Sequence, residues 1–234
     1  MSKKPLEKDL REALGWIVSY VALMSLGENL SRQIGVEKCL TAPLAAGFAA
    51  ALWLWVRRRG WAVRCGLCAF QGRAGDYLYF LPLAAMASVN LWQGVTLRLS
   101  PVETALYLLG MLCVGFVEEV IFRGLLYTAL KQENAKRAMA VASLMFGLGH
   151  IVNLLNGAAM LETGLQLVYA CAAGLLFTVL FEKGRSLIPS IAAHSAVNML
   201  SAFSVEGTLA FTAFTAAALT AVALGYAAWI WRRA

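Results

Sequence analysis

Apolar blocks of about 17 to 28 residues follow one another along almost the whole chain, and this pattern limits the fold more than any other feature. A helix needs about 20 such residues to cross a hydrocarbon core of ~30 Å. Only 14% of the 234 residues are charged, against roughly a quarter in ordinary soluble domains. The sequence therefore predicts an all-α, polytopic membrane protein and excludes a soluble globular domain.

Eight segments are expected to form helices that cross the membrane. The first is the shortest apolar run and is followed by Glu28, so it could instead lie in the membrane interface. The expected segments are 13–30, 40–56, 76–97, 103–130, 137–155, 163–181, 187–205 and 208–231.

The basic residues indicate the orientation of these helices. With both termini in the cytoplasm, sixteen of the 20 Lys and Arg fall on the cytoplasmic side, and Arg32, Lys38 and Arg98 fall on the other. Because Lys and Arg accumulate in cytoplasmic loops, we expect a multi-pass integral membrane protein with both termini cytoplasmic. The composition is typical of a prokaryotic cell membrane. Membrane lipid is the expected partner of the basic loops, and nucleic acid is not.

The five cysteines form no even disulfide framework. Cys65 and Cys68 make a CxxC pair, which could be half of a zinc site or a redox pair. Because no second pair lies nearby in the sequence, we interpret them as two loop thiols.

Three charged residues lie inside the fourth apolar segment rather than in a loop: Glu118, Glu119 and Arg123. A charge near the centre of a bilayer costs on the order of 3 kcal/mol, so such residues usually face a cavity and serve a function. The only two histidines, His150 and His194, also fall inside apolar segments. Counted by helix rise from the nearest basic residue, Glu118 and the histidines lie at depths that differ by about 7 Å, so they can converge on one buried site.

Spacing within the helices suggests how these groups divide their roles. Residues four apart share a helix face, which pairs Glu119 with Arg123 and His194 with Asn198. Glu118 points about 100° away from Glu119. We interpret Glu119 as neutralised by Arg123 and Glu118 as free to face the cavity, and the reverse assignment stays open.

Such a group of side chains could activate water. A buried carboxylate can act as a general base, and His150 beside it can hold the water. His194 and Asn198 can donate hydrogen bonds to the oxygen that becomes negative when a peptide carbonyl is attacked. Each residue taken singly could instead form a hydrogen bond between helices.

The runs EEVIFR (118–123), FGLGH (146–150) and HSAVN (194–198) resemble the EExxxR, FxxxH and HxxxN motifs of the CPBP family. This family comprises CAAX prenyl endopeptidases and Abi-type intramembrane proteases that include bacteriocin-processing members. The three motifs occur in the family's order between about 99 and 203. The resemblance divides the chain into an N-terminal membrane region of about three helices (1–98), a protease core (99–205), and a last helix with a basic C-terminus (206–234).

The resemblance implies an intramembrane endopeptidase of the glutamate type, EC class 3.4, that acts on a membrane-anchored or lipid-modified protein. It assigns water activation to Glu118 with His150, the oxyanion site to His194 and Asn198, and support to Glu119 and Arg123. We expect no cofactor or metal. Zinc at Glu118, His150 and His194 is the alternative, although the sequence has no HExxH helix.

Other functions remain open. Buried Glu, His and Arg also mark transporters and proton relays, although no inverted repeat is found. His150 and His194 could be axial haem ligands, and the family fold could serve as a non-catalytic immunity factor or scaffold. The sequence names neither the substrate nor its lipid modification. Two of the three motif positions lie nearer the non-cytoplasmic face, so an opening on that side is a further hypothesis.

Overall fold

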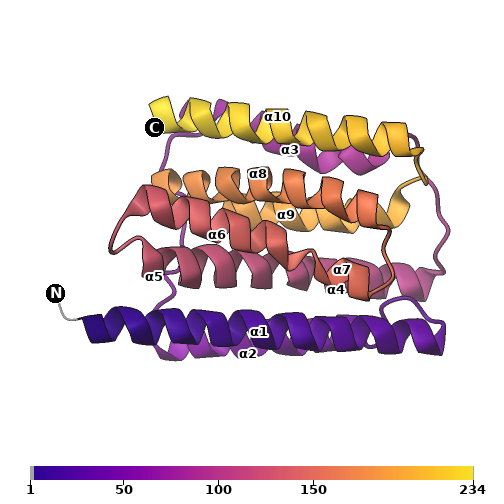
Figure 1. Cartoon of the computed structure of the whole chain (residues 1–234), viewed down its shortest axis with the longest axis horizontal. Helices are drawn as coiled ribbons and strands as arrows, with labels where there is room; N and C mark the ends of the chain where they lie inside the picture. The colour runs from indigo at the N-terminus through magenta and orange to yellow at the C-terminus, as the bar shows by residue number, and fades with distance from the viewer. Residues whose placement is uncertain (1–2, 234) are drawn as a thin grey trace.

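The computed structural model describes residues 3–233 and confirms an all-α fold, with helices that run side by side along one direction (Figure 1). Apart from one isolated bridge between Val95 and Ser204, the regular structure of these residues is helical. The elements are α1 Lys3–Ile34, α2 Thr41–Arg58, η1 Ala74–Phe80, α3 Leu81–Ala87, η2 Ser88–Leu91, α4 Pro101–Glu119, the π-helix η3 Val120–Tyr127, α5 Thr128–Leu130, α6 Ala135–Gly149, α7 Val152–Leu155, α8 Met160–Gly184, α9 Ile188–Leu200, η4 Ser201–Phe203 and α10 Leu209–Arg233.

Five stretches of the described residues are long and apolar enough to cross a membrane, and the first expected segment is one of them. They are Leu6–Ile34, Pro101–Leu130, Ala135–Leu155, Met160–Gly184 and Leu209–Arg233. These helices make the chain an integral membrane protein.

The other three segments that we expected to span are also helical, but they are shorter or interrupted. The 40–56 segment forms α2, whose 18 residues include Arg57 and Arg58. The 76–97 segment contains three short helices rather than one. Leu78, Tyr79 and Phe80 adopt positive φ angles just before α3, and such a left-handed backbone cannot continue a right-handed helix. In the 187–205 segment α9 has 13 residues, which is about 20 Å of helix.

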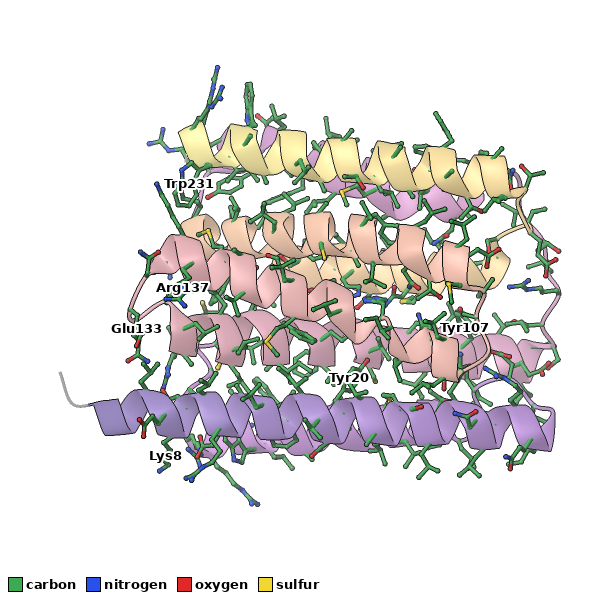
Figure 2. All side chains as sticks on the ribbon, in the orientation of Figure 1. Lys8, Tyr20, Tyr107, Glu133, Arg137 and Trp231 are labelled. Carbon is green, nitrogen blue, oxygen red and sulfur yellow. The ribbon has the colours of Figure 1, made fainter. Side chains whose placement is uncertain are left out.

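The two ends of the bundle can be told apart by the residues that lie there. The first turn of α1 and the last turn of α10 lie at the same end (Figure 1). Lys8, Glu133, Arg137 and Trp231 lie near that end, and Tyr107 lies toward the opposite one (Figure 2). We call these the terminal end and the far end.

A glycine brings together the two helices that carry most of the motif residues. A Cβ on Gly115 of α4 would lie 2.3 Å from Ser195 Oγ and 2.8 Å from Ser195 N of α9. Any larger residue at this position would push the helices apart. Gly115 therefore lets the end of α4, with Glu118 and Glu119, approach His194.

Candidate active site

Glu118 lies in the middle of the bundle with its carboxylate held from two sides. Its Oε1 accepts a hydrogen bond of 2.6 Å from the hydroxyl of Tyr20, which is buried on α1. Its Oε2 lies 3.5 Å from His194 Nε2. The side chain is 14% exposed and lines a cavity of about 340 Å³. A carboxylate in this position is oriented by protein groups and still reaches open space.

Glu119 is turned away from this cavity and is fully buried. Its Oε1 accepts hydrogen bonds from Arg123 Nη1 at 3.1 Å and from His194 Nδ1 at 2.9 Å. The Arg123 guanidinium also lies 4.2 Å from the centre of the Phe146 ring, at a distance typical of cation–π contacts. The structure therefore places the two glutamates as the helix spacing predicts, with Glu119 paired and Glu118 on the cavity.

Arg123 lies within η3, where the hydrogen bonding changes from i→i+4 to i→i+5. All eight residues of this segment, Val120–Tyr127, are buried. We expected a continuous α-helix here, and nothing in the hydrophobic pattern indicates the change. Short π-helical segments are frequent at functional sites, because they alter the direction of side chains within a helix.

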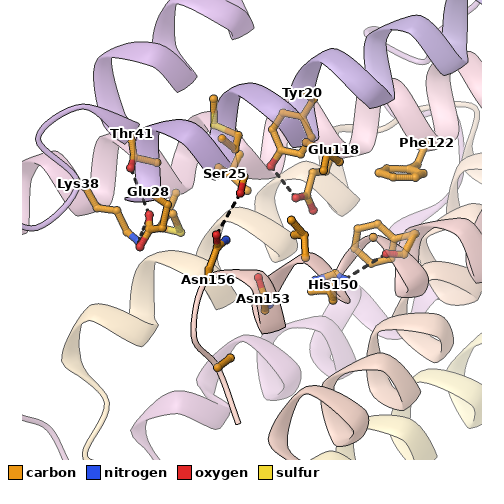
Figure 3. A pocket seen from close by; sticks show the side chains of 18 of the residues that line it. Tyr20, Ser25, Glu28, Lys38, Thr41, Glu118, Phe122, His150, Asn153 and Asn156 are labelled. Carbon is orange, nitrogen blue, oxygen red and sulfur yellow. Dashed lines mark hydrogen bonds and ion pairs between the residues drawn. The ribbon is translucent and has the colours of Figure 1, made fainter. Parts of the chain in front are cut away.

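His150 follows the last residue of α6 and lines the same cavity as Glu118. Its Nδ1 lies 3.1 Å from the carbonyl oxygen of Phe146, which can only accept, so Nδ1 carries a hydrogen and donates it. In the neutral ring Nε2 is then an acceptor. Figure 3 shows the side chains of Glu118 and His150 on opposite walls of one space.

His194 and Asn198 lie on α9 behind this cavity. They line a second, smaller cavity of about 80 Å³ together with Phe177 and Tyr169, and His150 borders both cavities. His194 stacks on the Phe177 ring at a centroid distance of 5.8 Å. The structure thus links Glu118, Glu119, Arg123 and His194 by contacts of 3.5 Å or less, and places His150 and Asn198 beside them. Their assigned roles stay predictions.

Tyr20 contacts Glu118 directly, and the sequence did not indicate it as a site residue. A tyrosine within an apolar helix usually serves packing, and its polar end can bond to any nearby group. Asn153 and Asn156 also line the cavity and carry no motif. The packing of α1 against η3 brings Tyr20 to Glu118, and the sequence does not indicate that packing.

The zinc alternative requires Glu118, His150 and His194 to converge on one ion. Among residues 3–233 no group of three or more His, Cys, Asp or Glu side chains is placed to hold a metal ion. We therefore derive no step through a metal, and the choice between the metal-free site and the zinc alternative stays a prediction.

The two loop cysteines line neither of the cavities that the motif residues border. Cys65 is fully buried, and burial raises the pKa of its thiol to about 12. Cys68 Sγ lies 3.2 Å from the carbonyl oxygen of Arg185. Both thiols are free. Burial of the Cys65 thiol makes it a poor nucleophile, which favours a packing role for this residue.

Comparison with known families agrees with the motifs. Residues 100–200 match the family model described as type II CAAX prenyl endopeptidase Rce1-like, which covers a little under half of the chain. Neither curated proteins nor solved structures give a significant match. The matched segment contains all six motif residues discussed above. Residues 100–200 are thus similar to an Rce1-like domain, and the family that this model describes is one of proteases.

Proposed function

We propose that this protein is an intramembrane endopeptidase in which Glu118 activates a water molecule against a peptide bond of a membrane-anchored protein or peptide. The observation that carries the proposal is the position of Glu118. Its carboxylate is fixed by Tyr20, borders the cavity, and lies across that cavity from His150. The family match supports a peptidase rather than a transporter or a haem protein.

In the proposed mechanism a water molecule lies between Glu118 and Nε2 of His150. The water donates one hydrogen bond to each of these acceptors, which directs its remaining lone pair to the substrate carbonyl. Glu118 takes a proton as the water oxygen bonds to the carbonyl carbon. It returns that proton to the leaving amine when the carbon–nitrogen bond breaks, so Glu118 ends the cycle as the carboxylate with which it began.

The negative oxygen formed in this step needs hydrogen-bond donors. Asn198 is the first candidate, because its amide lines the small cavity that His150 shares with the large one. His194 lines the same cavity, but its Nδ1 hydrogen already goes to Glu119, so it joins Asn198 as a donor from Nε2 only when both ring nitrogens carry a hydrogen. Glu119 and Arg123 act indirectly, since the 2.9 Å contact of Glu119 with Nδ1 fixes the orientation of the His194 ring.

The proposed topology places the terminal end of the bundle in the cytoplasm. Most basic residues then follow the rule that Lys and Arg stay on the cytoplasmic side. No cofactor is proposed.

The test is cleavage of membrane-inserted peptides by the protein in liposomes, read by mass spectrometry. Glu118→Gln keeps the shape of the side chain and an oxygen that accepts from Tyr20, but it removes the base. We expect at least a ~100-fold loss of turnover, as for other general bases, with an unchanged unfolding temperature. Glu162→Gln is the matched control, because Glu162 is an exposed glutamate at the start of α8. Turnover retained by Glu118→Gln would refute the role of Glu118 as the base. Absence of turnover from the wild type would contradict the proposal and leave a non-catalytic protein with the family's motifs.

A further inference from the structure

The cavity that holds Glu118 runs along one face of α1. Its lining residues on that helix include Tyr20, Met24, Glu28 and Arg32, which are four residues apart and therefore share a face. From Tyr20 to Arg32 the helix rises about 18 Å at 1.5 Å per residue. The cavity is therefore long enough for several residues of an extended chain.

The two ends of this cavity differ in exposure. Around Glu118 the lining includes the buried side chains of Tyr20 and Phe146. At the other end Arg32 and Ala158 are exposed. Arg32 lies in the last turn of α1, whose first turn is at the terminal end of the bundle. The cavity thus opens toward the far end.

Two cations line the open end, and one of them is already neutralised. Lys38 Nζ lies 2.7 Å from both carboxylate oxygens of Glu28 and 3.2 Å from Glu37. Burial alone would lower the pKa of Lys38, but these carboxylates raise it above its ordinary value. Lys38 therefore stays charged and paired (Figure 3).

Arg32 differs from Lys38 in this respect. Among the residues that the structure describes, no carboxylate lies within 4 Å of its guanidinium. The Arg32 side chain therefore lies at the mouth of the cavity, and none of the described acidic side chains accepts a hydrogen bond from it. Arginine binds carboxylates through two parallel hydrogen bonds, and such bonds are stronger than those between neutral groups.

The middle of the cavity offers a donor of the kind that a peptide backbone requires. Asn156 Oδ1 accepts hydrogen bonds from Ser25 Oγ at 3.0 Å and from Asn29 Nδ2 at 2.9 Å. These bonds fix the Asn156 side chain to α1 and leave its amide nitrogen without a protein partner among residues 3–233. That nitrogen can donate to a carbonyl oxygen of a bound chain.

We infer that the cavity admits an extended substrate segment from the far end of the bundle, and that Arg32 binds a carboxylate of this segment. An extended chain advances about 3.3 Å per residue, so ~18 Å corresponds to five or six residues between that carboxylate and the bond at Glu118. The carboxylate belongs to an acidic side chain or to the substrate's C-terminus. This inference rests on the proposed function, and it names a specificity residue outside the family motifs.

The test compares peptides that differ only in charge at one position. An aspartate is placed three to eight residues from the cleaved bond, with asparagine at the same position as the neutral partner. Peptides that end five or six residues from the bond, with a free or an amidated C-terminus, distinguish a terminal carboxylate from a side chain. We expect a KM about tenfold lower for the charged peptide, with a maximum at five or six residues and an unchanged kcat.

Substitutions of Arg32 test whether this residue causes the preference for the peptide with the charged carboxylate. Arg32→Gln should remove the preference for the charged peptide, and Arg32→Glu should transfer it to a peptide with lysine at that position. Arg98→Gln is the control, because Arg98 is a partly exposed arginine that does not line the cavity and lies 3.8 Å from Glu206.

The outcomes separate this inference from the proposed function. Wild-type turnover with equal KM for charged and neutral peptides overturns the role of Arg32 alone, and so does a preference that persists in Arg32→Gln. Absence of wild-type turnover on every peptide overturns the proposed function and this inference with it.

Discussion

Replacing Tyr20 by phenylalanine removes one oxygen atom from the candidate site. The hydroxyl donates the 2.6 Å hydrogen bond to Glu118 Oε1, a length typical of bonds from a hydroxyl to a charged carboxylate. The Tyr20 ring lies 5.8 Å from the Phe48 ring and is otherwise kept by phenylalanine. The substitution therefore tests the orientation of Glu118 without a change in packing volume.

The expected size of the effect follows from the environment of the carboxylate. A hydrogen bond to a charged group contributes about 1.5–3 kcal/mol. Glu118 is 14% exposed to the cavity, so water can replace part of the lost bond. The lower value, about 1.5 kcal/mol, then applies and corresponds to roughly a tenfold loss in rate.

The assay measures kcat and KM separately on one cleavable peptide in liposomes. We expect Tyr20→Phe to lower kcat about tenfold and to leave KM unchanged, because Tyr20 holds the base rather than the substrate. Tyr107→Phe is the matched control, since the Tyr107 hydroxyl lies 2.8 Å from Ser201 Oγ, toward the far end. A wild-type kcat in Tyr20→Phe, or a raised KM with kcat intact, would refute the positioning role.

Two further predictions concern the buried ion pair and metals. Glu119→Ala leaves Arg123 buried without its carboxylate and should lower the free energy of unfolding by about 3–5 kcal/mol, whereas Glu182→Ala, in a partly exposed pair with Lys131, should cost about 1 kcal/mol or less. Denaturant unfolding in detergent measures both, and equal losses would contradict the difference in burial. Cleavage should survive exhaustive chelation, since the described residues gather no metal ligand set. Complete loss that zinc restores would overturn the metal-free mechanism.

The helical class of the fold could be predicted because long apolar runs leave few other structures for a chain in a membrane. The positions at which the expected helices are interrupted could not be predicted. In the expected 76–97 segment, three consecutive residues with left-handed backbone precede Pro82, and their side chains are aromatic or aliphatic rather than the glycine that marks such turns. Hydropathy measures composition over a window and does not register a local change of backbone.

Within the site, the pairing of Glu119 with Arg123 followed from helix spacing, because residues four apart meet even when η3 begins between them. The contact of His194 with each of the two glutamates could not be predicted from helix spacing. They depend on the close approach of α4 and α9 at Gly115, and a single sequence does not reveal which helices are neighbours. Tyr20 was missed for the same reason.

The boundary of the family match differs from the boundary of the candidate site. The match begins at residue 100, but the donor to Glu118 and one whole wall of its cavity come from α1. In the proposed mechanism, therefore, the motifs supply the reacting groups, while α1 determines how long the cavity is and what charge lies at its mouth. A chain with the same three motifs and a different first helix would keep the chemistry and lose both the Tyr20 contact and the Arg32 site. Substrate selection should thus depend on residues from Tyr20 to Thr41, where no family motif lies.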